Sequence, residues 1–317
     1  MQTNDTSRRN FLKNSVLVGA GLSVHAPTEA TIAMPKNTHQ FSFCLNTSTI
    51  REQNLGLMAE METAAKAGYN GIEVWVSTVE KYVEKGGKLS DVRKKATDLG
   101  LTIEDAIGFS KWIVDDPTER AKALEQNKRE MGMLAEIGCK RIAAPPFGAT
   151  NMPGLNLNEA AARYAKLLEL GDQSGVLPVL ELWGFSANMH HLSEVVFVAL
   201  ESGHPKACIL ADVFHLYNGK SPFVGLQKLS GSMLPIFHMN DYPAEPAIGT
   251  INDSYRVFPG DGVAPLNQIL KDLHAKNTPI VLSLELFNKE YWKMNALDAA
   301  KMGLTKMKAA VAKALAS

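Results

Sequence analysis

After residue 40 the sequence alternates short apolar runs with longer amphipathic stretches, and this alternation repeats eight times. The expected strands are residues 41–45, 71–76, 102–108, 141–144, 177–182, 208–213, 236–239 and 280–286. The expected helices lie near 55–68, 88–99, 116–137, 158–174, 192–202, 222–231, 264–276 and 295–315. Strands that alternate with helices predict a parallel sheet, and eight such units allow the sheet to close. We therefore expect an α/β fold with one (β/α)8 TIM barrel over residues 40–317.

An open, doubly wound parallel sheet is the alternative fold for this alternation. That fold binds its ligand through a Gly-x-Gly-x-x-Gly turn after the first strand, and this chain has no such turn there. The stretch 116–137 shows how clearly the sequence indicates the start and the end of one helix. Asp116 and Pro117 are typical of a helix start, and Gly138 is typical of a helix end. The closed barrel is favoured.

The first 33 residues differ from the remainder and predict an export signal. Arg8 and Arg9 precede a short, weakly apolar stretch over residues 15–24, and residues 7–13 resemble the twin-arginine (Tat) export motif. That stretch is too short to span a bilayer, so we expect no membrane anchor. Residues 34–39 would be a linker, with cleavage near Ala30 or Ala33. We expect the Tat machinery as a partner and a periplasmic or extracellular location.

Charge and cysteine content exclude two further classes of protein. The 33 Lys and Arg residues balance 33 Asp and Glu residues, whereas nucleic-acid binders usually carry a basic excess. Cys44, Cys139 and Cys208 are too few and too scattered for a disulfide scaffold, so we expect buried thiols. We expect no nucleic-acid partner, and we keep a homo-oligomer among the expected assemblies.

Polar residues end four consecutive strands that are otherwise apolar. Glu181, Asp212, His238 and Glu285 occupy these positions. A buried carboxylate is costly unless it is paired or binds a metal, and a barrel places the carboxyl ends of its strands at one mouth. Three carboxylates and one imidazole suit Mn²⁺, Mg²⁺ or Co²⁺, and they also accept Zn²⁺. We therefore predict one divalent ion, with Mn²⁺ or Mg²⁺ preferred, held by these four residues.

The pattern resembles the xylose isomerase-like barrel superfamily, specifically its sugar phosphate isomerase/epimerase branch, over nearly all of residues 40–317. The matching pieces are Glu181 in Leu-Glu-Leu-Trp, Asp212-x-x-His215, His238-x-Asn-Asp241, the loop from Arg256 to Gly262 and Glu285. The resemblance implies that Glu181 and Glu285 bind the metal and transfer protons on opposite faces of the substrate. It also implies that His215 and Arg256 contact substrate oxygens.

This chemistry fits the residue types, because a metal that polarises a carbonyl eases removal of the neighbouring proton. The function that we expect is therefore a sugar isomerase or epimerase acting through an enediolate. No Lys/Arg cluster or Gly-rich loop marks a phosphate site, and phosphorylated sugars are scarce outside the cytoplasm. We therefore expect an unphosphorylated sugar or keto-sugar.

Further residues near the strand ends are weaker candidates. We assign Glu73, Trp112 and Trp183 to the substrate, although a surface position for Glu73 and core packing for the tryptophans are alternatives. Asp241 would support His238 from behind or cap the next turn. His215 could be purely structural.

Arg256 also has an alternative role, an ion pair with Asp253 or Asp261 that orders its loop.

Three rival functions share the same barrel. A lyase or hydratase could cleave 3-keto-glycosides by enolisation and β-elimination. A DNA-repair enzyme of the endonuclease IV type would need extra histidines, but none lies between His39 and His190. A non-catalytic sugar-binding barrel would be expected to lack a metal ligand, and all four candidates are present.

Overall fold

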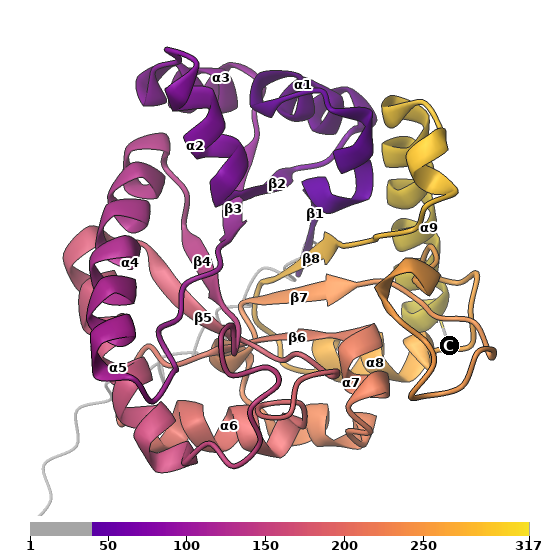
Figure 1. Cartoon of the computed structure of the whole chain (residues 1–317). Coiled ribbons are helices and arrows are strands. Elements are labelled where there is room, and N and C mark those ends of the chain that lie inside the picture. The colour runs from indigo at the N-terminus through magenta and orange to yellow at the C-terminus, as the bar shows by residue number, and fades with distance from the viewer. Residues whose placement is uncertain (1–39, 317) are drawn as a thin grey trace, which may run out of the picture. The chain divides into compact units, whose positions relative to one another are not determined.

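Eight parallel strands form one sheet, in the order β3-β2-β1-β8-β7-β6-β5-β4, with helices around it (Figure 1). The computed structural model describes residues 40–316, so the predicted signal over 1–33 and the linker over 34–39 lie outside the described residues. Strand β1 pairs with both β2 and β8, which joins the first unit to the last. Between β3 and β4 a backbone N–H of Lys140 donates to the carbonyl of Ile103 at 3.2 Å. The result is the predicted α/β TIM barrel, nearly closed.

Each strand begins and ends within two residues of its predicted bounds. The strands are β1 Phe41–Asn46, β2 Gly71–Trp75, β3 Thr102–Ile107, β4 Arg141–Ala144, β5 Leu177–Glu181, β6 Ile209–Asp212, β7 Ile236–Met239 and β8 Ile280–Leu284. Because all run parallel, their carboxyl ends meet at one mouth, which is where TIM barrels carry their sites.

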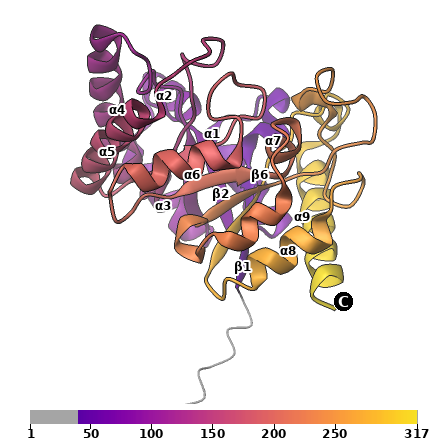
Figure 2. The ribbon, with the colours of Figure 1, turned by 90° about the horizontal axis from the view of Figure 1, so that it is seen from below.

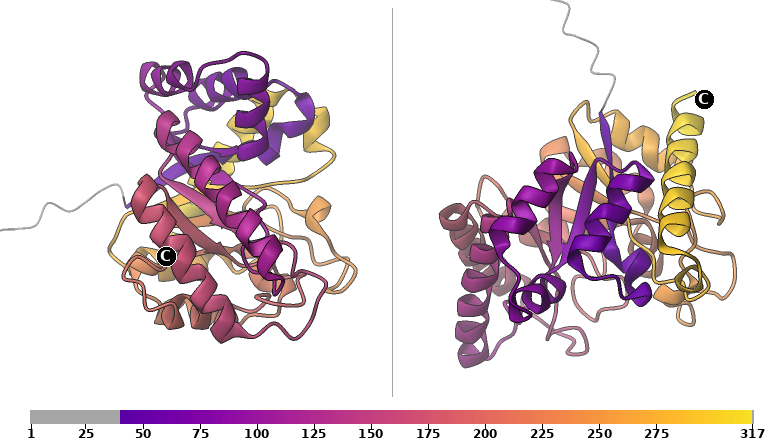
Figure 3. Two further views of the ribbon diagram at one scale, coloured as in Figure 1. Left: turned by 60° about the vertical axis from the view of Figure 1, so that its left-hand side comes forward. Right: turned by 90° about the horizontal axis from the view of Figure 1, so that it is seen from above.

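Helices cover the outside of the strands, and α6 lies across β6 in Figure 2. The α-helices are α1 Leu57–Ala67, α2 Val76–Glu84, α3 Leu89–Asp98, α4 Pro117–Ile137, α5 Leu157–Ser174, α6 Leu192–Glu201, α7 Val213–Asn218, α8 Leu266–His274 and α9 Ala296–Ala316. The last helix, α9, packs beside α1, which closes the outer ring where the sheet also closes (Figure 3).

Helix α4 shows why the sequence marks these elements well. The Asp116 side chain accepts hydrogen bonds from the backbone N–H groups of Thr118 and Glu119, and Pro117 stands in the first turn. At the other end Gly138 adopts φ 81°, a left-handed conformation that glycine tolerates better than other residues. The predicted start and end of this helix are confirmed.

Two features of the helical layer differ from the prediction. The helix expected near 222–231 is a 3-10 helix, η2 Phe223–Lys228, in which Leu226 is the one buried residue. A single anchored side chain is too little to stabilise a longer amphipathic helix. Helices α2 and α7 were not predicted, because each follows its strand directly and no loop residues separate the two patterns.

The apolar interior has two parts, one between sheet and helices and one inside the barrel. The inner part includes Cys44, Val179, Leu210 and Ile236, all buried. All three cysteines are free and buried, which confirms the prediction of buried thiols. Within residues 40–316, no helix combines the length and apolar character that a bilayer span requires.

Candidate active site

The ends of strands β5 to β8 bring the four predicted metal ligands to one place. Glu181 ends β5, Asp212 ends β6, His238 lies within β7, and Glu285 follows β8. All four are buried. Glu181, His238 and Glu285 each present one ligand atom, and these atoms lie within 4.8 Å of one another.

Two atoms of this cluster are buried without a hydrogen-bond partner in the described structure, Oε2 of Glu181 and Nδ1 of His238. Nδ1 lies 3.1 Å from Oε2 of Glu285. Buried polar atoms are normally hydrogen-bonded, so unpartnered atoms on two residues of one cluster indicate a missing partner. One imidazole nitrogen and two carboxylates are a donor set that divalent ions accept. The residues present therefore fit a divalent metal.

Asp212 lies beside this cluster and is already bonded on both oxygens. Oδ2 accepts hydrogen bonds from Nη1 of Arg256 and Nδ2 of Asn240, each at 2.8 Å, and lies 3.7 Å from Nδ1 of His238. Oδ1 accepts the backbone N–H of His215 at 2.8 Å. Asp212 thus joins the cluster to the residues that follow β6.

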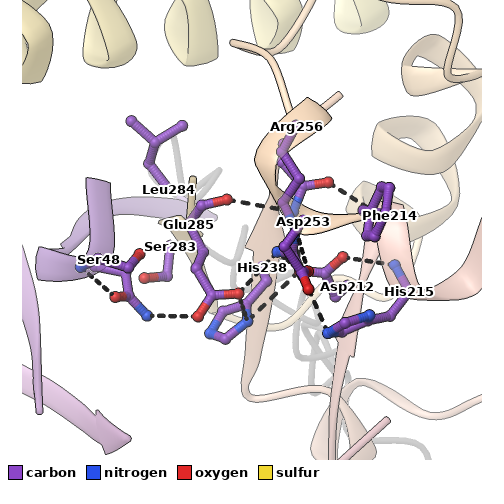
Figure 4. Close-up of polar contacts among 12 residues, drawn as sticks. Ser48, Asp212, Phe214, His215, His238, Asp253, Arg256, Ser283, Leu284 and Glu285 are labelled. Atoms are coloured by element: carbon purple, nitrogen blue, oxygen red, sulfur yellow. Dashed lines mark hydrogen bonds and ion pairs between the residues drawn. The ribbon is translucent and has the colours of Figure 1, made fainter. Parts of the chain in front are cut away.

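Arg256 comes from the long connection between β7 and α8, and it is fully buried (Figure 4). Its Nη1 donates to Asp212 and to Oε2 of Glu285, each at 2.8 Å, and its Nη2 donates to Asp253 at 2.6 Å. Nη2 also donates to Nε2 of His215 at 3.0 Å. Burial alone would lower the pKa of Arg256, but these carboxylates raise it, so the guanidinium stays charged. The ion pair with Asp253 is therefore present, within a larger network.

His215 is held neutral in this network. Burial lowers its pKa, and the charge of Arg256 lowers it further. Since Nε2 accepts from Arg256, the ring hydrogen must be on Nδ1, and Nδ1 has no partner in the described structure. His215 therefore offers one hydrogen-bond donor.

The two glutamates have opposite electrostatic environments. Burial, and then the charge of Glu285, raises the pKa of Glu181. Burial would also raise the pKa of Glu285, but His238 and Arg256 outweigh it and lower that pKa. Two neighbouring carboxyls whose pKa values are driven apart are typical of a proton-transfer pair.

A cavity of about 300 Å³ opens above this cluster. Its polar lining includes Glu181, His215, Arg256 and Glu285. Six aromatic side chains complete most of the wall: Trp75, Phe109, Trp183, Phe185, Phe287 and Trp292. The cavity is in the size range of small-molecule sites.

A comparison with protein families decides what kind of barrel this is. Residues 61–310 match the family model described as the xylose isomerase-like TIM barrel. The chain belongs to the xylose isomerase-like TIM barrel family.

Proteins similar to this chain include isomerases, epimerases and dehydratases. Inosose isomerase of Bacillus licheniformis is 27% identical over 81% of this chain and 93% of that protein. Fructoselysine 3-epimerase of Escherichia coli O157:H7 is 22% identical over 71% of this chain and 83% of that protein. 3-Dehydroshikimate dehydratase of Pseudomonas putida is 22% identical over 77% of this chain but 39% of that protein. The chain is thus similar to enzymes that act on sugar-like molecules.

Solved structures of the family share the fold. A crystal structure of the IOLI protein with a binding zinc atom has a TM-score of 0.79 and 22% identity. The alignment covers 86% of this chain and 98% of that chain.

Within this xylose isomerase-like barrel, two residues assigned to the substrate lie elsewhere than expected. Glu73 does not line the cavity; it is fully buried beneath His238 and bonds its Nε2 at 2.9 Å. Trp112 packs against Tyr164 and donates from Nε1 to the carbonyl of Pro145 at 2.8 Å. Trp112 is therefore a core residue, which is the alternative role considered for the tryptophans.

Of the two roles considered for Asp241, the structure shows the capping role. Asp241 does not contact His238 in the described structure; instead its carboxylate accepts the backbone N–H groups of Tyr242, Gly260, Gly262 and Ala264. A Cβ on Gly262 would lie 2.4 Å from Oδ1 of Asp241, so this close packing requires glycine. Asp241 therefore orders the loop that carries Arg256. Asp261, the other partner considered for Arg256, pairs with Lys306 instead.

Trp183 lies where the sequence predicts, in the cavity wall, with its ring stacked on Phe185 at 5.1 Å. The prediction missed Asn46, whose Nδ2 donates to Oε1 of Glu285 at 3.1 Å. It also missed Asn240, which bonds Asp212. Both could have been found as polar residues at or just after the ends of β1 and β7.

Proposed function

We propose that this chain is a divalent-metal-dependent isomerase or epimerase that transfers a proton, through an enediolate, on an unphosphorylated sugar or keto-sugar. The observation that carries the proposal is the buried pair Glu181 and Glu285, which flanks His238 at the floor of a cavity. The inosose isomerase and fructoselysine 3-epimerase relatives support the reaction class. A non-catalytic barrel would be expected to lack a ligand residue, and all four candidates are present.

The ion would be held by Glu181, His238 and Glu285, with Asp212 beside them. Mn²⁺ or Mg²⁺ suits this carboxylate-rich set, and Co²⁺ or Zn²⁺ is also compatible with it. When bound, the ion supplies positive charge that polarises a substrate carbonyl and makes the neighbouring proton more acidic.

The protein's own side chains orient the substrate and transfer the proton. Both oxygens of Glu285 are engaged, by Asn46 and by Arg256, which fixes its orientation. Glu181 would hold the ion through one oxygen and use the other to take a proton and return it, because its Oε2 has no partner in the described structure. Nδ1–H of His215 would donate to a substrate oxygen, which orients the sugar between the two carboxyls.

A second candidate is a lyase that acts on keto-glycosides through the same first step. Glu181 would remove the proton beside the ketone, the electron pair would form a carbon–carbon double bond, and the group on the next carbon would leave with a proton. The 3-dehydroshikimate dehydratase relative supports this candidate, because a dehydratase also eliminates a group.

The decisive experiment is incubation of the metal-loaded protein in D₂O with ketoses, aldoses and 3-keto-glycosides. We expect deuterium at the carbon beside the carbonyl, and loss of that exchange in Glu181→Gln. Exposed Glu136→Gln on α4 is the matched control and should exchange like wild type. Released aglycone would favour the lyase. No exchange with any compound of the panel would contradict both candidates.

We also propose that residues 1–33 direct export by the Tat route to the periplasm or beyond. Arg8 and Arg9 support this, because their pair and the apolar stretch that follows have the layout of such signals. A reporter fused to residues 1–40 should be exported, and the Arg8→Lys, Arg9→Lys double variant should remain inside. Equal export of both fusions would contradict the proposal.

A further inference from the structure

The wall of the cavity is a nearly continuous series of aromatic rings. Neighbouring ring centroids lie 6.4 Å apart for Phe287 and Trp75, 5.4 Å for Trp75 and Phe109, 6.1 Å for Phe109 and Trp183, and 5.1 Å for Trp183 and Phe185. These rings come from the ends of β2, β3, β5 and β8 and from the loops that follow them. They surround the cavity on several sides rather than forming one flat platform.

The polar atoms of this wall are largely engaged with the protein itself. The indole N–H of Trp75 donates to Asn46, and that of Trp292 donates to the carbonyl of Ser48. The hydroxyl of Ser254 donates to Asn252. Apart from the exposed Lys289, which also lines the cavity, the wall therefore offers a ligand mainly ring faces and ring edges.

The floor is different, because its groups are charged or carry a free donor. Glu181 and Glu285 lie there, with Arg256 bonded to Glu285 and His215 presenting Nδ1–H. The cavity is thus divided into a polar floor, where the proposed proton transfer would occur, and an aromatic upper part.

A free monosaccharide matches only the floor. It carries a hydroxyl on nearly every carbon, and one ring face can stack on an indole while the edge hydroxyls still need hydrogen-bond partners. Here several edges would meet phenyl and indole rings instead. A flat apolar group would gain from the same rings through burial and through stacked or edge-on contacts.

We infer that the substrate is an aryl-substituted keto-sugar, such as a 3-keto-glycoside with an aromatic aglycone. The sugar ketone lies at the floor, and the aryl group lies among Trp75, Phe109 and Trp183. This inference rests on the proposed function for the ketone, and on the cavity wall alone for the aryl group. It applies equally to the isomerase and the lyase.

The test compares binding of two unreactive probes, phenyl β-D-glucopyranoside and methyl β-D-glucopyranoside, to the metal-loaded full chain. Three of the four tryptophans line the cavity, so quenching of tryptophan fluorescence reports occupancy directly. We expect the phenyl glycoside to bind at least tenfold more tightly. Equal affinity for the two glycosides would overturn the inference.

Phe185 and Tyr255 provide matched variants, because both rings are exposed, by 49% and 41%, and only Phe185 lines the cavity. Phe185→Ala should reduce the phenyl preference several-fold without loss of folding, and Tyr255→Ala should leave it unchanged. An equal effect of both variants on the preference would also overturn the inference.

Failure of the inference and failure of the proposed function remain distinguishable. Deuterium exchange on simple ketoses without a phenyl preference supports the function and overturns the aryl assignment. If the phenyl glycoside binds more tightly and Phe185→Ala reduces this preference, but no ketone exchanges deuterium, the aryl site is supported and the proposed function is contradicted.

Discussion

Nε2 of His238 lies 2.9 Å from Oε1 of Glu73, and neither side chain is exposed to solvent. A carboxylate oxygen accepts hydrogen bonds, so the contact keeps a ring hydrogen on Nε2 and directs Nδ1 toward Glu285, 3.1 Å away. Ser283 donates its hydroxyl to the other oxygen of Glu73 and fixes that carboxylate in turn. Glu73 is therefore a positioning residue for His238, of the kind that metal-binding histidines usually have.

The first prediction follows from this contact. Glu73→Gln keeps the shape but removes the charge that orients the ring, so metal affinity should fall by about 10- to 100-fold. Titration with Mn²⁺ against a competing chelator measures the change. Glu104→Gln is the control, because Glu104 is also buried but pairs with Lys140 and Arg141 away from the cluster. An unchanged affinity in Glu73→Gln would show that the contact does not orient a ligand.

The second prediction concerns Arg256, whose guanidinium joins Asp212, Asp253 and Glu285. Truncation would leave these carboxylates without their cation, and breaking a buried ion pair costs about 3–5 kcal/mol. We expect Arg256→Ala to lower the free energy of unfolding by that amount in urea denaturation of the metal-free protein. Arg256→Lys should lose less, since it keeps the charge but cannot bond all partners at once. Equal stability of Arg256→Ala and wild type would contradict this network.

The third prediction separates the two roles considered for Asp241. Its carboxylate accepts four backbone N–H groups, so Asp241→Ala should lower the free energy of unfolding by about 2–3 kcal/mol. Because it does not touch His238, Mn²⁺ affinity should change less than in Glu73→Gln. Parallel urea denaturation and metal titration measure both effects. A selective loss of metal affinity with normal stability would instead support the role behind His238.

The barrel and the four strand-end residues could be predicted because each depends on a local pattern. A polar side chain in or at the end of an apolar run, as at His238 or Glu181, needs a partner wherever the chain folds. The parallel topology then places those ends together without knowledge of any side-chain contact.

The remaining site residues depend on contacts that no local pattern encodes. Glu73 meets His238 across the barrel interior, and the two are far apart in the sequence. Phe185 and Trp292 lie in loops, where sequence does not show whether a ring covers the cavity or faces solvent. Arg256 could reach either substrate or Asp253 from its loop, and only the folded connection decides between them.

The fourth prediction concerns Glu60 on α1, which is 6% exposed and has an oxygen, Oε2, without a partner in the described structure. Burial raises the pKa of Glu60 to about 7, above its usual value of 4.5. Between these values the native protein keeps a proton that the unfolded chain has released, so this group's contribution makes stability fall as pH rises through that window. Above the native pKa the native state carries the full cost of a buried, ionised Glu60, and below pH 4.5 this cost is absent because both states are protonated. We therefore expect the free energy of unfolding of Glu60→Gln to exceed that of wild type by up to about 3 kcal/mol at pH 8 and to equal it at pH 4. Urea denaturation at both pH values measures this difference. Glu62→Gln, on the exposed face of the same helix, is the control and should show no gain at pH 8, because Lys95 and Lys66 lower the pKa of Glu62. Equal stability of Glu60→Gln and wild type at pH 8 would mean that Glu60 is already ionised and solvated in the native state.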